Sequence, residues 1–173
     1  MQQYGRGTQF VCLSLVSIVY ACSGENSTPQ RVAQISSAEE SQPAATGCDA
    51  SLWNHVYNPK RLQQIASCLS VTGTIDESNV DDDGDQHFLL KLDPGQDTLV
   101  NKRNNKKKNG DIVLEIVCAN PTTMKKPSAA CAGYTNPVAV LPVGAHVRAT
   151  GTYVLDTHNG WVEIHPVSKL EKM

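Results

Sequence analysis

The segment from Val143 to Val167 constrains the fold of this chain more than any other stretch. Apolar and polar residues alternate over two runs, His146–Leu155 and Trp161–Val167, which are separated by the turn Asp156–Gly160. Alternation with a period of two is typical of half-buried β-strands, and Asp, Asn and Gly are residues that tight turns favour. The segment therefore predicts a β-hairpin, and it indicates an all-β domain.

Three earlier runs show the same alternation. They predict strands over Leu69–Ile75, Phe88–Leu92 and Ile112–Val117, which brings the expected number of strands to five. Gly73 and Gly151 lie inside predicted strands, where glycine permits tight coiling of the backbone. Five coiled strands predict a small, partly open barrel of the OB type.

A short N-terminal helix is expected before the first strand. Asn58 and Pro59 favour a helix start, because Asn accepts hydrogen bonds from free amides and Pro tolerates the first helical position. The apolar residues that follow lie on one helical face, and we expect the helix to end near Ser67. By contrast, Lys102–Gly110 is expected to be a basic polar loop, and Cys118–Pro142 a long connection.

The first 21 residues have the layout of a secretory signal peptide. One basic residue, Arg6, precedes an apolar run, Phe10–Tyr20, that is too short to cross a bilayer as a helix. The residues Val19–Cys22 resemble a bacterial lipobox, which implies that Cys22 is lipidated and becomes the mature N-terminus. A lipid at this position would anchor the protein without a transmembrane helix. We expect a lipoprotein at the bacterial cell envelope, on the periplasmic or the outer-membrane face.

Residues 22–47 are expected to form a flexible tether, and residues 48–173 the folded domain. The tether is rich in Ser, Gln, Ala, Glu and Pro, has no aromatic residue, and has too little apolar surface to offset the entropy of ordering. Without Arg6, the mature chain has 14 basic and 17 acidic residues, a formal charge of −3. This balance argues against a dedicated nucleic-acid-binding protein, which usually has an excess of basic residues.

Four cysteines remain in the folded domain. Their even number in an exported protein favours two disulfides, and three pairings are open. We prefer the two local bridges, Cys48–Cys68 and Cys118–Cys131. A four-cysteine zinc site is the alternative, although the close pairs of ligands typical of such sites are missing.

Four motifs resemble an uncharacterised family of exported bacterial and archaeal proteins. They are V-T-G-T-I at Val71–Ile75, D-G-D-Q-H-F at Asp83–Phe88, L-K-L-D-P at Leu90–Pro94 and G-W-V-E-I-H-P-V at Gly160–Val167. The resemblance extends roughly from Cys48 to Leu170. It implies export and an OB-like β-barrel, and it implies no particular activity.

The candidate binding residues are concentrated near the last predicted strand. Trp161, Glu163 and His165 share the face opposite the apolar residues, His158 lies in the preceding turn, and His87 lies on the outer face of the second strand. Imidazole and carboxylate groups suit Zn²⁺ and other transition ions. The competing interpretation is structural: Trp161 covers a barrel end, and the other side chains hydrogen-bond to neighbouring loops.

Two charged segments are weaker candidates. Asp81–Asp85 gathers oxygen ligands around a glycine, as calcium sites do, but the ligand spacing of an EF-hand is absent, and we favour a solvated turn. Lys102–Lys108 contains five cations that are able to contact a polyanion such as a nucleic acid or a glycan on an OB-like face.

The sequence favours a lipid-anchored binding or structural module over an enzyme. It contains no Gly-x-Ser-x-Gly or His-Glu-x-x-His motif, and Asp156 near His158 has no convincing serine partner. A metal-dependent hydrolase that uses the His/Glu group is the main alternative, and a polyanion-binding protein is the second. We expect no obligatory cofactor, with Zn²⁺ and Ca²⁺ as the candidate ions, and an envelope protein or a glycan as partner.

Overall fold

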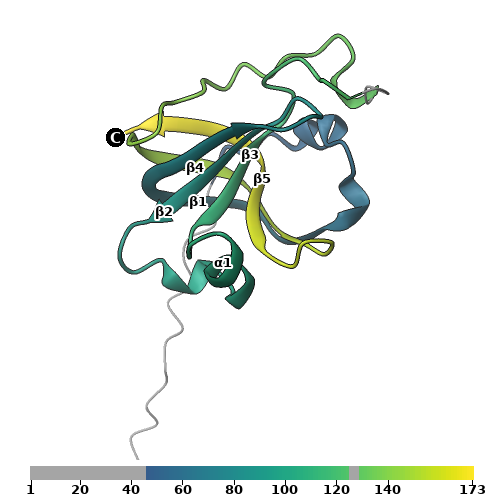
Figure 1. Cartoon of the computed structure of the whole chain (residues 1–173). Helices are drawn as coiled ribbons and strands as arrows, with labels where there is room; N and C mark the ends of the chain where they lie inside the picture. The colour runs from purple at the N-terminus through teal and green to yellow at the C-terminus, as the bar shows by residue number, and fades with distance from the viewer. Residues whose placement is uncertain (1–45, 125–128) are drawn as a thin grey trace, which may run out of the picture. The chain divides into compact units, whose positions relative to one another are not determined.

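The computed structural model describes residues 46–124 and 129–173 (Figure 1). The signal peptide, Cys22 and nearly all of the tether predicted above lie outside these residues. Within the described residues, no helix has both the length and the apolar character needed to cross a bilayer.

The described chain consists mainly of one five-stranded sheet. Its strands are β1 (Leu62–Val80), β2 (Gln86–Leu92), β3 (Ile112–Ile116), β4 (His146–Asp156) and β5 (Val162–Lys172). The hydrogen-bonding order is β1-β2-β3-β5-β4, and β4 pairs again with β1, so that the sheet closes on itself. All neighbours are antiparallel except β3 and β5, which are parallel. The predicted hairpin and the number of strands are confirmed.

The first strand joins the two ends of the sheet because it is long and irregular. Its 19 residues pair with β4 over its first two thirds and with β2 over its second half, and the register shifts at three places. At Gly73 a side chain would meet the backbone oxygen of Lys91 at 2.1 Å. Glycine is therefore required where β1 crosses closely over β2.

The interior contains two clusters of apolar side chains. The larger fills the space enclosed by the sheet and includes the fully buried Phe88, Leu90 and Ile164. The smaller lies under the short 3-10 helix η1 (Ala50–His55), where Leu52 and Val56 pack with Leu62, Val117 and Val154. Leu62 and Val154 belong to β1 and β4, so Leu52 of η1 and Val56 cover part of the outer surface of the sheet.

The helix predicted between Pro59 and Ser67 is wrong beyond its first turn. Only η2 (Pro59–Arg61) is helical, as a 3-10 turn, and β1 begins at Leu62. Residues 62–66 pair with 153–156 of β4, with a register shift after Gln64. The hydrogen bonds to β4 outweigh the local helical pattern, because tertiary contacts routinely override intrinsic helix propensity.

The basic segment predicted as a loop forms the short helix α1 (Lys102–Lys107). Asn101 caps it: its side chain accepts from the amides of Arg103 and Asn104, and the Asn104 side chain accepts from the Asn101 amide. An asparagine pair replaces the Ser/Thr and Glu/Gln of the usual capping box, which hides this helix start in the sequence. Two further short turns, η3 (Asp97–Leu99) and η4 (Ala129–Cys131), lie in connections.

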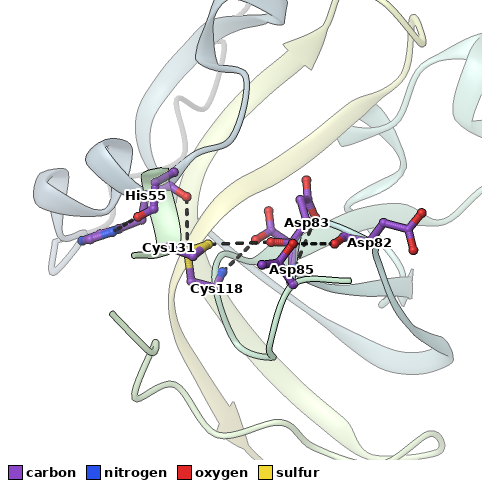
Figure 2. The surroundings of a disulfide bond; sticks show 8 residues. His55, Asp82, Asp83, Asp85, Cys118 and Cys131 are labelled. Atoms are coloured by element: carbon purple, nitrogen blue, oxygen red, sulfur yellow. Dashed lines mark hydrogen bonds between the residues drawn. A yellow bond between two sulfur atoms is a disulfide. The ribbon is translucent and has the colours of Figure 1, made fainter. Parts of the chain in front are cut away.

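Both disulfides have the preferred pairing. Cys48 is bonded to Cys68 of β1, and Cys118 is bonded to Cys131 in the connection between β3 and β4. Figure 2 shows the second bridge between η1 and the β1–β2 turn: Cys118 Sγ lies 3.5 Å from the His55 carbonyl, and Cys131 Sγ lies 3.7 Å from that of Asp83. This bridge therefore joins three segments that are far apart in the sequence.

Candidate functional site: a buried cluster of acids and histidines

Three neighbouring strands bring acidic and histidine side chains together on the outer face of the sheet. His87 of β2 is the register partner of Glu115 of β3, and Val113, two residues before Glu115 on the same strand, is the partner of Glu163 of β5. His165 follows Glu163 on the same face, and Asp85 lies just before β2. We call these five residues the acid–histidine cluster: Asp85, His87, Glu115, Glu163 and His165.

His165 is at the centre of the cluster. Its Nδ1 lies 2.9 Å from Glu115 Oε2 and 3.1 Å from Glu163 Oε1, while the side chains of His165 and Glu163 are 1% and 0% exposed. Because both partners of Nδ1 are carboxylate oxygens, Nδ1 carries the hydrogen and donates. The other ring nitrogen, Nε2, is buried and has no hydrogen-bond partner among the described residues.

His87 forms the outer edge of the cluster. Its Nδ1 lies 3.5 Å from Asp81 Oδ2 and 3.5 Å from Glu115 Oε1, and its Nε2 lies 3.3 Å from Lys108 Nζ. Burial lowers the pKa of His87, but the hydrogen bonds to Asp81 and Glu115 outweigh burial and raise it to about 9. His87 is therefore a cation at neutral pH.

Burial and mutual attraction set the charges of the inner residues. Burial alone would raise the pKa of Glu115, but His165 and His87 hold it well below its usual range. Burial likewise would lower the pKa of His165, and Glu115 with Glu163 raises it well above the usual value. Burial, with the nearby charge of Glu115, raises the pKa of Glu163. Burial and the charge of Asp83 raise the pKa of Asp85 to about 7.

Four partly exposed residues next to the cluster form what we call its rim: Arg61, Asp81, Lys108 and Trp161. Arg61 Nη1 lies 3.3 Å from Asp156 Oδ2, and Arg61 Nη2 lies 3.9 Å from Glu115 Oε2. Trp161 donates its indole hydrogen to Glu163 Oε2 at 3.0 Å, and Lys108 Nζ lies 4.2 Å above the Trp161 ring. The rim thus presents an aromatic ring and cations above a buried layer of carboxylates.

The helix α1 supports this rim through a buried asparagine. Asn104, which is 0% exposed, donates to the carbonyls of Asp111 and Val162 and accepts from the Val162 amide. Asn101 donates to the carbonyl of Gly160. These bonds fasten α1, and with it the segment that carries Lys108, to the β4–β5 turn next to Trp161.

Of the five predicted binding residues, four are brought together and one is not. His87, Trp161, Glu163 and His165 belong to the cluster or its rim, whereas His158 is exposed in the β4–β5 turn, where its amide donates to Asp156 Oδ1 at 2.8 Å. The predicted single-face geometry of the last strand is therefore right, but that face is covered rather than open.

The sequence analysis missed Asp85, Glu115 and Arg61. Glu115 stands between apolar residues in the middle of β3, and a charge in such a strand is a signal that a buried partner exists. Asp85 is hidden at the end of an acidic run that resembles a solvated turn. Only the partners of its side chain distinguish it: Oδ1 accepts from the Cys118 amide at 2.7 Å, and Oδ2 is buried without a partner among the described residues (Figure 2).

The acidic turn Asp81–Asp85 does not direct its carboxylates toward one point. Asp82 accepts from the Thr123 hydroxyl at the surface, Asp83 accepts from the Asp85 amide, and Asp85 points toward Cys118. The four lysines and one arginine of residues 102–108 lie on or just after α1, and all except Lys108 are exposed.

Three groups of side chains have potential ligand atoms within 4.8 Å of one another: Asp81–His87–Glu115, Asp85–Glu115–His165 and Asp85–Cys118–Cys131. The third group is excluded because its two sulfur atoms are bonded to each other. The first group is at the rim and the second is fully buried. Both fit a transition ion better than calcium, because each supplies an imidazole nitrogen.

Comparison with protein-family models, curated proteins and solved structures finds no match to this chain. The assignment of function therefore rests on the geometry of the site.

Proposed function

We propose that this protein is a non-catalytic binding module with an OB-like barrel, exported and held at the cell envelope by a lipid on Cys22. The closed strand order and the parallel pairing of β3 with β5 support an OB-like architecture. In OB-folds the ligand-binding face consists of the second and third strands together with the loops after the first and fourth strands. The contacts of the rim with His87 of β2, and its positions in the β1–β2 turn and after the β4–β5 turn, support a ligand-binding face of this kind.

The observation that carries the proposal is the arrangement of that rim. His87 lies on β2, Asp81 lies in the β1–β2 turn, and Trp161 follows the β4–β5 turn with Lys108 above its ring. An aromatic ring beside fixed cations is a suitable platform for a polymer with planar or ring-shaped units and negative charge. The exposed cations of α1 extend the positive surface beyond the rim.

Burial argues against the alternative of a His/Glu hydrolase. A general base must come within hydrogen-bond reach of its substrate or of one intervening water. The side chains of Glu163 and His165 are 0% and 1% exposed, and their facing atoms are engaged with each other and with Glu115. The groups most capable of catalysis are therefore the least accessible, while the accessible rim has the character of a binding surface.

The ligand that this rim favours is an anionic polymer, and we expect an acidic glycan because the proposed location is extracytoplasmic. The test is fluorescence anisotropy of a labelled heparin hexasaccharide titrated with the full chain. The double variant Lys107→Gln/Lys108→Gln should weaken binding at least about fivefold, because charged contacts contribute on the order of 1 kcal/mol each. The control Lys169→Gln/Lys172→Gln removes the same charge from the end of β5, away from the rim, and should bind like the wild type.

Two comparison probes separate the sources of negative charge. Neutral chitohexaose should bind more weakly than the heparin hexasaccharide, and a dT12 oligonucleotide that binds more tightly than either glycan would favour the nucleic-acid alternative. Absence of binding to every probe, or equal weakening by both double variants, would overturn the proposed face. The anchor is tested separately: Cys22→Ser should move the protein from the membrane fraction to the soluble fraction.

A further inference from the structure

The Cys118–Cys131 disulfide lies beside a buried carboxyl group. A carboxylate oxygen of Asp85 and the two sulfur atoms lie within 4.8 Å of one another (Figure 2). Asp85 is 2% exposed; its Oδ1 accepts from the Cys118 amide at 2.7 Å, and its Oδ2 is buried without a hydrogen-bond partner among the described residues. A buried polar atom without a partner is energetically costly, so the place of this carboxyl group calls for an explanation.

We propose that the Cys118–Cys131 bridge is a site of thiol–disulfide exchange, at which an external thiol attacks Cys131 and Asp85 gives a proton to Cys118. The substrate class is a thiol reductant, either a dithiol or two molecules of a monothiol. This inference does not rest on the proposed function, because none of the rim residues takes part in it.

The two cysteines differ in exposure, which sets the order of the reaction. Cys118 is 1% exposed, whereas Cys131 is partly exposed and lines a cavity of about 780 Å³ with Ala132 and Tyr134. Exchange begins when a thiolate attacks one sulfur of the bridge, and access helps to decide which sulfur that is. An incoming thiolate therefore attacks Cys131 Sγ. Cys118, whose amide already bonds to Asp85, supplies the leaving group.

The reaction takes place in two steps. In the first, the external thiolate forms a bond to Cys131 Sγ, the bond between the two cysteines breaks, and its electron pair stays on Cys118 Sγ, which takes the proton of Asp85. In the second, another thiolate of the reductant attacks the external sulfur of the mixed disulfide, and the Cys131 thiolate leaves and is protonated by solvent. The bridge gains two electrons and two protons, the reductant becomes a disulfide, and Asp85 regains its proton from solvent.

The surroundings of Asp85 suit it to hold this proton. Burial and the charge of Asp83 raise the pKa of Asp85 to about 7, although the hydrogen bond from the Cys118 amide and the charge of His165 act in the opposite direction. The charge of Glu115 raises this pKa further. A proton donor works best when its pKa is close to the pH of its surroundings. In the neutral carboxyl group the hydrogen belongs on Oδ2, because Oδ1 already accepts from the Cys118 amide.

The backbone of Cys118 adds a second local feature. Its φ of 53° lies in the left-handed region, which residues other than glycine rarely adopt. Conformations of this kind persist where the surroundings enforce them, and they are concentrated at functional sites. The contacts that enforce this one include the disulfide and the bond from the Cys118 amide to Asp85. Opening the bridge removes one of these restraints, which favours reduction.

The test measures how fast dithiothreitol reduces each bridge of the folded full chain. Samples are quenched with N-ethylmaleimide, and mass spectrometry of the cysteine-containing peptides gives the fraction of each bridge that is open. The rate is divided by the concentration of the dithiothreitol thiolate, so that only groups of the protein affect its pH dependence. For Cys118–Cys131 this corrected rate should fall at least about tenfold between pH 6 and pH 9, as Asp85 loses its proton. For Cys48–Cys68 it should stay constant, because no carboxylate among the described residues forms such a group with those two sulfur atoms.

Asp85→Asn removes the proton donor and keeps an oxygen that accepts from the Cys118 amide. At pH 6 it should lower the corrected rate for Cys118–Cys131 at least about tenfold. At pH 9 it should react at least as fast as the wild type, because ionised Asp85 repels the leaving thiolate. Asp111→Asn is the matched control: Asp111 is also a buried aspartate with an unpartnered Oδ2, and it forms no such group with the sulfur atoms. It should behave like the wild type at both pH values.

The order of attack gives a second measurement, which needs no variant. After a short exposure of the wild type to glutathione and a quench with N-ethylmaleimide, Cys131 should carry glutathione and Cys118 the maleimide. The reverse labelling, a bridge that dithiothreitol opens only when the chain unfolds, or a corrected rate that does not change with pH would each overturn the proposal. So would an effect of Asp85→Asn that is equal at pH 6 and pH 9. None of these outcomes depends on glycan binding, so the two proposals can fail separately.

Discussion

Replacing Asn104 should destabilise the protein more than any other single change in α1. Its side chain accepts a hydrogen bond from the Val162 amide and donates to the carbonyls of Val162 and Asp111. All three groups belong to residues that are at most 5% exposed. Asn104→Ala leaves these groups without partners, at about 1–3 kcal/mol each. The low end of this range for all three gives a loss of at least about 3 kcal/mol. That is a large part of the 5–15 kcal/mol typical of a domain.

The assay is urea unfolding followed by far-ultraviolet circular dichroism, with both disulfides intact. Asn105→Ala is the matched control: its side chain is exposed one residue further along the same helix, so it should change the free energy of unfolding by less than about 0.5 kcal/mol. Asn104→Asp keeps one oxygen acceptor but turns a carboxylate oxygen toward two carbonyls, and should be at least as damaging as Asn104→Ala. If Asn104→Ala and Asn105→Ala differ by less than about 1 kcal/mol, the reasoning from buried hydrogen bonds is refuted.

Three further predictions concern packing, a disulfide and pH. Gly151→Ala should lower the free energy of unfolding by about 1–3 kcal/mol in the same urea assay, because the added methyl would lie 2.4 Å from the Pro166 carbonyl oxygen; a neutral effect would contradict this. Replacing Cys118 and Cys131 together by Ala should cost about 3 kcal/mol through the greater freedom of the unfolded chain, again measured with urea, and an unchanged midpoint would count against it. Burial raises the pKa of Tyr153, whose folded state therefore favours the neutral phenol. Its contribution to stability is retained below the ordinary pKa near 10 and falls as the pH rises above it, so wild type should lose more stability than Tyr153→Phe between pH 9 and pH 11, and parallel losses would refute the assignment.

The position of His165 in β5 was predictable from the sequence, whereas its main partner was not. A period of two along one strand assigns alternate side chains to opposite faces, so Trp161, Glu163 and His165 were correctly placed together from the sequence alone. The partner of His165 was not predictable in the same way. Glu115 reaches it because β3 pairs in parallel with β5, across about 50 residues of chain, and the sequence carries no local signal for that register.

The two wrong predictions of secondary structure, at Leu62–Ser67 and at Lys102–Gly110, have one cause: contacts between segments distant in the sequence override the local pattern. Leu62 to Ser67 have an apolar spacing that fits a helix, but these residues pair with β4, and a strand that closes a sheet gains hydrogen bonds that a short isolated helix lacks. The basic segment that follows η3 forms α1 because Asn104 finds three buried partners on Asp111 and Val162, residues that only the folded chain brings near.

The sequence by itself predicted the number of strands and the hairpin near the C-terminus, because alternation and turn residues are local properties. It favoured the observed cysteine pairing without excluding the other two. Only the tertiary structure decided which faces are covered and which charges meet. The acid–histidine cluster depends on the registers of three strands, β2, β3 and β5, and on the segments that cover them. Burial makes the partners of these residues necessary. At an open surface water would solvate the charges, whereas in the interior an unpaired charge is energetically costly, so each side chain needs a partner.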